Sequence, residues 1–249
     1  MAKLGSILCA GAALVGSLAI VGTADATTYN AVTDFSSTPA SPWSYGYGAA
    51  GTSFTAYSSA DYITNDFGTT GLDGYSQGTS GTVPVILQNY SGSTVDFAHT
   101  VVLPTGLLLL HPGDSDSLDS IIRFTAPTTG EYAISGYFQT LDTSPTGVTL
   151  IGADSHGALG SANFLGSPAV MPDTPGGTYD FGGDVYLQAG QWLEVGVNRD
   201  GVYTNDSTGL SLTISTVPEP AAWALMLVGF AGLGAALRAS RRRQASAVA

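Results

Sequence analysis

Short β-type runs separated by turn residues recur through the middle of the chain, and this pattern restricts the fold more than any other feature. Between residues 27 and 217 no stretch keeps an apolar period near 3.6 residues, as an amphipathic helix would. The segment 131–140 alternates with a period of two residues instead. Tyr132, Ile134 and Phe138 share one face of it, as the core-facing side chains of a β-strand do.

Six further runs have the same character: Val83–Leu87, Ile121–Phe124, Val148–Ile151, Val185–Leu187, Trp192–Val197 and Leu210–Ile214. Gly, Pro, Asn, Asp and Ser separate them, and these residues favour turns. The spacing predicts an all-β domain over residues 27–217, an antiparallel β-sandwich of jelly-roll-like type. Residues 27–80 are rich in Ser, Thr, Gly and Tyr. We expect either early strands with long loops or a partly ordered arm there.

The charge balance excludes one class of partner. The 249 residues include seven Lys or Arg and 19 Asp or Glu. Residues 27–217 retain only Arg123 and Arg199 against 17 acidic residues, a net charge of −15. Because phosphate binding needs clustered Lys and Arg, we expect no nucleic acid as a partner. The single cysteine, Cys9, precedes the domain, so a disulfide or a cysteine nucleophile within it is excluded.

The N-terminal segment reads as a secretory signal peptide over residues 1–26. Lys3 supplies the positive charge, and an apolar stretch of small residues follows it. Ala24 and Ala26 form an A-x-A cleavage site around Asp25, so the mature chain is expected to begin at Thr27. The chain is therefore predicted to be exported across the cytoplasmic membrane.

The C-terminal segment combines four features in a fixed order. Pro218, Glu219 and Pro220 come first, and Trp223 follows three residues after the second proline. Residues 221–237 form an uncharged apolar run of about 25 Å if helical, within the range for a transmembrane helix. A basic cluster ends the segment: Arg238, Arg241, Arg242 and Arg243.

This segment, residues 218–243, resembles the PEP-CTERM sorting signal in its Trp-Ala variant. The resemblance implies an exosortase-type sorting protease of Gram-negative bacteria as a partner. It also implies a transient membrane anchor, followed by release or transfer to the outer surface. Proteins with this signal are commonly associated with exopolysaccharide, so exopolysaccharide is the expected second partner. The alternative is a plain tail anchor with an incidental Pro-Glu-Pro linker.

A second, weaker resemblance covers residues 105–215. Arg123–Tyr132 and Leu187–Leu193 are similar to strand–turn–strand elements of secreted jelly-roll modules that resemble carbohydrate-binding ones. The resemblance implies a fold and only suggests sugar binding.

Aromatic residues are the candidate glycan-binding groups, because the C–H faces of sugars stack on aromatic rings. Trp43, Tyr45 and Tyr47 alternate, so one strand face would carry all three. We favour a core-facing role for this stripe over an exposed platform. In 192–197 the aliphatic residues share one face, which leaves Trp192 on the other beside Glu194. Trp192 therefore lies either in an exposed groove or packed under a loop.

Two acidic loops are candidate calcium sites, because Ca²⁺ takes oxygen ligands. Their residues are Asp114, Asp116 and Asp119 in one loop and Asp200, Asn205 and Asp206 in the other. Solvated turn residues are the favoured alternative. No cofactor is expected apart from such a structural calcium.

Catalytic motifs are missing from the sequence. Gly113, Asp114 and Ser115 are similar to the start of a GDS-type esterase, but such enzymes need a later Asp-x-x-His pair, and the last histidine is His156. There is no G-x-S-x-G and no H-E-x-x-H sequence. We therefore expect a non-enzymatic exopolysaccharide or biofilm matrix component with weak carbohydrate affinity. The alternatives are a dedicated lectin-like module and a glycan-active enzyme.

Overall fold

The computed structural model describes residues 26–38, 40, 42–155, 157–158, 170–171, 173–218 and 222–247. Ala26–Pro218 is one compact unit, and the C-terminal helix α1 (Ala222–Ala247) belongs to a second unit. Most of the predicted signal peptide, including Ala24, lies outside the described residues, as do Glu219 and Pro220 of the sorting motif.

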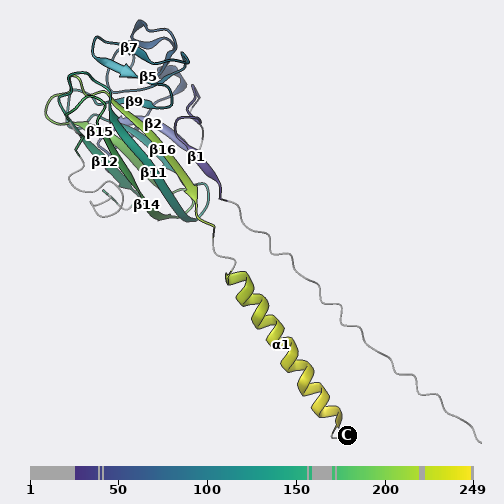
Figure 1. Ribbon diagram of the computed structural model, residues 1–249. Coiled ribbons are helices and arrows are strands. Elements are labelled where there is room, and N and C mark those ends of the chain that lie inside the picture. The colour runs from purple at the N-terminus through teal and green to yellow at the C-terminus, as the bar shows by residue number, and fades with distance from the viewer. Residues whose placement is uncertain are drawn as a thin grey trace, which may run out of the picture. The chain divides into compact units, whose positions relative to one another are not determined.

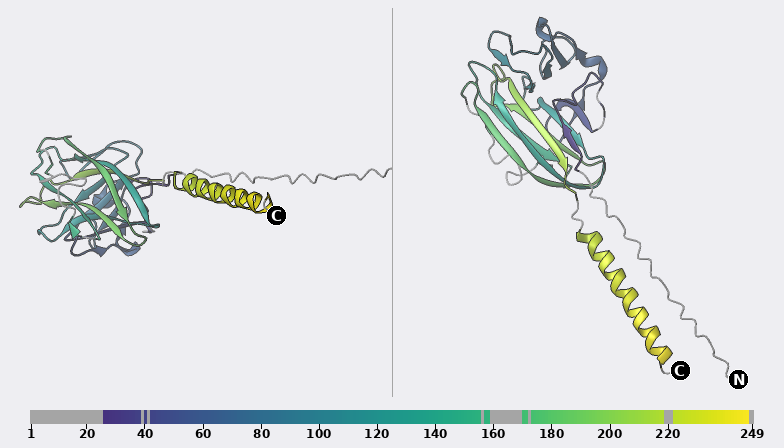
Figure 2. Two further views of the ribbon diagram at one scale, coloured as in Figure 1. Left: turned by 90° about the horizontal axis from the view of Figure 1, so that it is seen from below. Right: turned by 45° about the vertical axis from the view of Figure 1, so that its right-hand side comes forward.

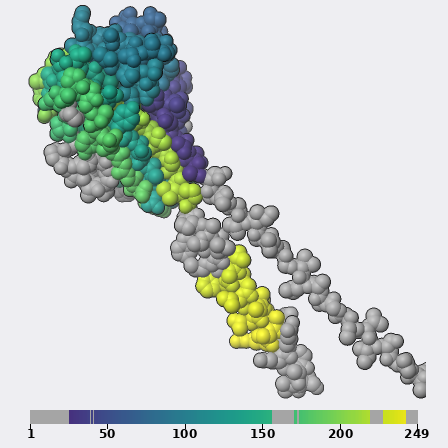
Figure 3. Space-filling view, in the orientation of Figure 1, coloured from purple at the N-terminus to yellow at the C-terminus, as the bar shows by residue number. Residues whose placement is uncertain are grey.

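Two antiparallel sheets form the domain, and the right-hand view of Figure 2 shows them as two layers. Within the described residues the first sheet has the order β14-β11-β16-β9-β6-β5-β4, and β1 also pairs with β16. Its strands are β1 (Thr28–Asn30), β4 (Tyr62–Ile63), β5 (Leu72–Ser76), β6 (Val85–Asn89), β9 (Leu108–His111), β11 (Gly130–Thr140), β14 (Thr178–Leu187) and β16 (Thr208–Thr216). The N-terminal β1 lies beside the C-terminal β16, purple beside yellow-green in Figure 3.

The second sheet has the order β13-β12-β15-β10-β2-β3 over the same described part of the chain. Its strands are β2 (Trp43–Gly48), β3 (Thr55–Ala56), β10 (Asp119–Thr125), β12 (Val148–Asp154), β13 (Gly157–Ala158) and β15 (Trp192–Arg199). A separate hairpin, β7 (Val95–Phe97) and β8 (Val101–Leu103), lies at one end of the sandwich, at the top in Figure 1. Two 3-10 turns precede β4 and β5: η1 (Ser59–Asp61) and η2 (Asp66–Gly68).

The core lies between the two sheets, and alternation along the strands builds it. Tyr132, Ile134 and Phe138 of β11 are buried, as the sequence predicted. Leu193 and Val195 of β15 contribute from the opposite sheet. The predicted antiparallel β-sandwich is therefore confirmed, and the described core residues all lie within the unit Ala26–Pro218.

Residues 27–80 contribute an aromatic cluster to this core as well as loops. Tyr75 stacks on Tyr45 and on Tyr57, with ring centroids 5.6 Å apart in both pairs. Phe35 meets Tyr45 edge-on at 4.7 Å. Because aromatic pairs of this kind stabilise a core beyond their buried area, this segment is part of the folded domain.

The helix α1 follows Pro218-Glu219-Pro220 and includes Trp223 and Arg238 of the sorting signal. Among the residues that the structure describes, no helix is long and apolar enough to cross a membrane. The membrane span expected over residues 221–237 is thus not confirmed.

Candidate functional site

The outer face of the second sheet carries the tryptophan that the sequence singled out. Leu193, Val195 and Val197 point into the core, so Trp192 and Glu194 point to the outer face. Trp192 is half-buried there. Its backbone is fixed by Ser155, because the Trp192 N–H donates to Ser155 Oγ at 2.7 Å and the Ser155 N–H donates to the Trp192 carbonyl at 3.0 Å.

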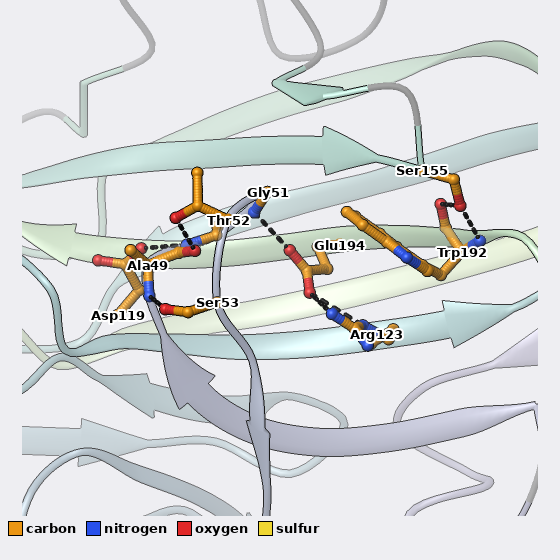
Figure 4. A network of polar contacts seen from close by, with 10 residues as sticks. Ala49, Gly51, Thr52, Ser53, Asp119, Arg123, Ser155, Trp192 and Glu194 are labelled. Atoms are coloured by element: carbon orange, nitrogen blue, oxygen red, sulfur yellow. Dashed lines mark hydrogen bonds and ion pairs between the residues drawn. The ribbon is translucent and has the colours of Figure 1, made fainter.

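Glu194 anchors an arginine beside this ring. Arg123 of β10 lies directly opposite Glu194 in the sheet, and its Nε donates to Glu194 Oε1 at 2.9 Å. An ion pair from Arg123 Nη2 to the same oxygen is 2.5 Å long. The second oxygen of Glu194 accepts the Gly51 N–H at 2.7 Å, so the loop after β2 closes over the carboxylate (Figure 4). The Glu194 side chain is 1% exposed and that of Arg123 is 24% exposed.

The Arg123 guanidinium contacts two aromatic rings. Its Cζ is 4.6 Å from the centroid of the Trp192 ring and 3.9 Å from that of Phe54. Trp192 begins β15, the strand next to β10, whereas Phe54 lies in the loop between β2 and β3. We call Trp192, Arg123 and Phe54 the Trp192 row.

A second polar network continues along the same face. Asp119 accepts the Ala50 N–H at 2.9 Å and a hydrogen bond from the Asn198 side-chain amide. Figure 4 shows Asp119 beside the 49–53 loop. Burial raises the pKa of Asp119, and the two hydrogen bonds oppose that rise. The loop 49–53 is therefore held to the sheet at both Asp119 and Glu194.

The aromatic stripe proposed as a second glycan platform is not one. Trp43 and Tyr45 are 2% and 1% exposed, because their strand face packs against the opposite sheet. Tyr47 is partly buried and packs against Tyr57, with ring centroids 5.2 Å apart. The alternative favoured from the sequence, a core-facing stripe, is the correct one.

The carboxylates of the two predicted calcium loops lie in different surroundings. Asp116 pairs with Arg199 at 2.8 Å, Asp119 binds neutral donors, and Asp114 and Asp200 are exposed. In the described ranges, no group of three or more His, Cys, Asp or Glu side chains is placed to hold a metal ion. Asp119 and Asp206 are both buried, and burial raises the pKa of Asp206 to about 7.

Sequence reasoning missed a cavity of about 110 Å³ at the β7–β8 end of the sandwich. Its lining contains both apolar and polar residues, among them Phe67, Phe97, His111, Asp142 and Asn205. Phe67 and Asn205 have positive φ angles, 52° and 61°, which non-glycine residues rarely adopt. Burial lowers the pKa of His111. Nothing in the sequence predicted left-handed backbone at Phe67 or Asn205. These residues are far apart in the sequence, and only the fold brings them to one cavity.

Comparisons with known proteins give little information beyond this geometry. No family model matches the chain, and no curated protein matches it. A solved structure, the Podospora anserina GH26-CBM35 β-(1,4)-mannanase, is similar with a TM-score of 0.29 and 23% identity. The match covers 52% of this chain and 26% of that chain. A function for this chain has to come from its own residues.

Proposed function

We propose that this protein is an exported, non-enzymatic component of a polysaccharide matrix that binds glycan weakly through the Trp192 row. The observation that carries the proposal is a half-buried tryptophan on the outer sheet face, flanked by an arginine that a buried glutamate holds in place. Fixed rings beside a fixed donor are the elements that a glycan site needs.

Sugar rings match these elements chemically. The axial C–H face of a hexose is apolar and stacks on an indole, while its hydroxyls accept hydrogen bonds. Arg123 has five N–H donors on its guanidinium, and Glu194 Oε1 engages its Nε and Nη2 groups. Because Trp192 is only partly exposed and the Arg123 side chain is 24% exposed, a sugar gains limited contact area, which favours low affinity over that of a dedicated lectin.

The charge of the domain favours a neutral polysaccharide over an anionic one. Residues 27–217 carry a net charge of −15, and both arginines are already paired with carboxylates. A strongly acidic surface repels an anionic polymer. We therefore propose a neutral polysaccharide as the ligand.

Affinity electrophoresis tests this proposal. The unit 26–218 is run through gels that contain the producer's own exopolysaccharide or a neutral β-linked glucan or mannan. We expect retardation that Trp192→Ala abolishes. Tyr186→Ala is the matched control, because Tyr186 is 60% exposed on β14 of the other sheet and its loss should leave the retardation unchanged. Equal retardation of all three proteins would refute the role of the row.

The sorting function is proposed separately, on the order of Pro218, Glu219, Pro220, Trp223 and the following arginines. We propose export by the signal peptide and processing near Pro218 by an exosortase-type protease of a Gram-negative bacterium. Delivery to the outer surface or the medium then follows. Replacing Pro218-Glu219-Pro220 with three alanines should leave the unprocessed form associated with the cells. Processing at the normal rate in that variant would contradict the proposal.

A further inference from the structure

The loop that precedes β16 is fixed against a distant turn. The Asn205 side-chain amide donates to the Ser144 carbonyl at 2.9 Å, and Thr146 Oγ1 lies 2.5 Å from the Thr204 carbonyl. Asn205 itself is left-handed, with φ of 61°. These contacts hold Asp206 inside the domain, where it is 2% exposed.

Asp206 differs from the other buried carboxylates in what surrounds its oxygens. Asp206 Oδ2 is buried and has no hydrogen-bond partner among the described residues. Asp66, equally buried, accepts from Ser76, Ser80 and two backbone N–H groups. A buried carboxylate oxygen without any donor is strongly unfavourable unless a cation or proton compensates it.

Acceptor oxygens outnumber protons around this position. The single hydroxyl proton of Thr146 faces both the Thr204 carbonyl, at 2.5 Å, and Asp206 Oδ1, at 2.6 Å, and can satisfy only one of them. Nearby, the Thr100 hydroxyl faces both Asp142 Oδ1 at 2.6 Å and Asn205 Oδ1 at 3.4 Å. A cluster rich in acceptors and poor in donors suits a metal cation.

Among the described residues, no positive side chain contacts this cluster. The two arginines of residues 26–218 pair elsewhere, Arg123 with Glu194 and Arg199 with Asp116. The charges that act on Asp206 come from Asp142, Asp200 and Asp173, and all are negative. An external cation would remove this imbalance.

We propose that Asp206 Oδ2 is a ligand of a hard divalent cation of the calcium type, bound between the turn 144–147 and the loop 203–207. A cavity of about 10 Å³, close to the size that one water molecule requires, lies beside it. Five of its lining residues carry side-chain oxygens, namely Thr140, Asn205, Asp206, Ser207 and Thr208, and the others are Pro145, Gly147, Val148 and Met171.

The kinds of ligand available determine the calcium affinity that we expect. Because no group of three acidic, His or Cys side chains surrounds the cavity in the described part of the chain, carbonyl and hydroxyl oxygens supply most of the ligands. Ca²⁺ accepts such neutral oxygens, and extracellular modules bind it with dissociation constants of about 10⁻⁴–10⁻³ M. The cation ties the 144–147 turn to β16 and does not depend on Asp114 or Asp200.

Thermal unfolding of the chelator-treated unit 26–218 tests the site. We expect 10 mM CaCl₂ to raise Tm by about 3–10 °C, as binding to the folded state with this affinity requires. Asp206→Asn should abolish the rise. Thr146→Val, which removes one hydroxyl oxygen without changing side-chain size, should reduce it. Asp114→Asn is the matched control from the other acidic loop and should retain the full rise.

Terbium luminescence gives a readout that does not depend on stability. Tb³⁺ replaces Ca²⁺ at oxygen sites, and we expect saturable emission that added Ca²⁺ displaces. Thr146→Val should weaken this binding even if Asp206→Asn fails to fold. The proposal is overturned if neither calcium nor terbium binds at millimolar concentration. It is equally overturned if Asp114→Asn loses the response while Asp206→Asn and Thr146→Val keep it.

Discussion

Breaking the Arg123–Glu194 pair should destabilise the domain and disorder the Trp192 row together. Arg123→Met removes the charge but keeps an apolar stem of similar length, and it leaves Glu194 with one donor, the Gly51 N–H. Leaving a buried charge unpaired costs about 3–5 kcal/mol. Because the Arg123 side chain is 24% exposed, water enters part of the site, so we expect a loss of about 2–3 kcal/mol.

Urea unfolding of the unit 26–218 at pH 7 measures this loss. Glu194→Gln and the double variant complete a mutant cycle. The free energy of unfolding lost in the double variant should be smaller than the sum of the two single losses by at least ~1 kcal/mol. Arg199→Met is the control, because its partner Asp116 is 79% exposed and such pairs contribute below ~1 kcal/mol. Equal losses for Arg123→Met and Arg199→Met, or additive losses in the cycle, would refute the reasoning.

Four further substitutions test buried groups and close contacts. Tyr45→Phe should be neutral or stabilise by up to ~1 kcal/mol, because the Tyr45 hydroxyl is buried without a partner in the described residues. Tyr57→Phe should destabilise by about 1–2 kcal/mol, because the Tyr57 hydroxyl donates a buried 2.6 Å hydrogen bond to the Pro84 carbonyl. Thermal unfolding of the two variants measures this difference. The pKa of Asp206 is raised from 3.8 to about 7, so the folded state favours its protonated form. The resulting contribution to stability is complete below pH 4 and is lost as the pH rises through 7. In chelator, urea unfolding should therefore find Asp206→Asn more stable than the natural chain by about 1–2 kcal/mol at pH 8 and equal near pH 4. Gly46→Ala should reduce both stability and glycan retardation, because its Cβ would lie 2.7 Å from the Phe54 ring.

The two-residue period carried most of the fold prediction. It placed Leu193, Val195 and Val197 inside and Trp192 outside, because the backbone of a strand fixes which side chains share a face. The same period could not decide which face of the Trp43 strand is inside. Packing against the opposite sheet decides that, and it buries Trp43 and Tyr45.

Long-range contacts account for what the sequence could not predict. Arg123 and Glu194 are 71 positions apart, and only the register of β10 against β15 makes them neighbours. Asp206 was grouped with Asp200 by proximity in sequence, whereas its hydrogen bond comes from Thr146, 60 positions away. The spacing of residues within one loop carries no information about such partners.

Nuclear magnetic resonance of the indole N–H groups tests glycan binding by the Trp192 row most directly. The unit 26–218 contains two tryptophans, Trp43 in the core and Trp192 on the outer face, and Trp192→Phe assigns their two signals. On addition of a neutral polysaccharide or its oligosaccharides, the Trp192 signal should shift in a saturable way. The Trp43 signal, whose N–H donates to Asp34 at 3.1 Å, should not move. An unchanged Trp192 signal at millimolar sugar, in a sample that the gel shows to bind, would contradict the proposed site.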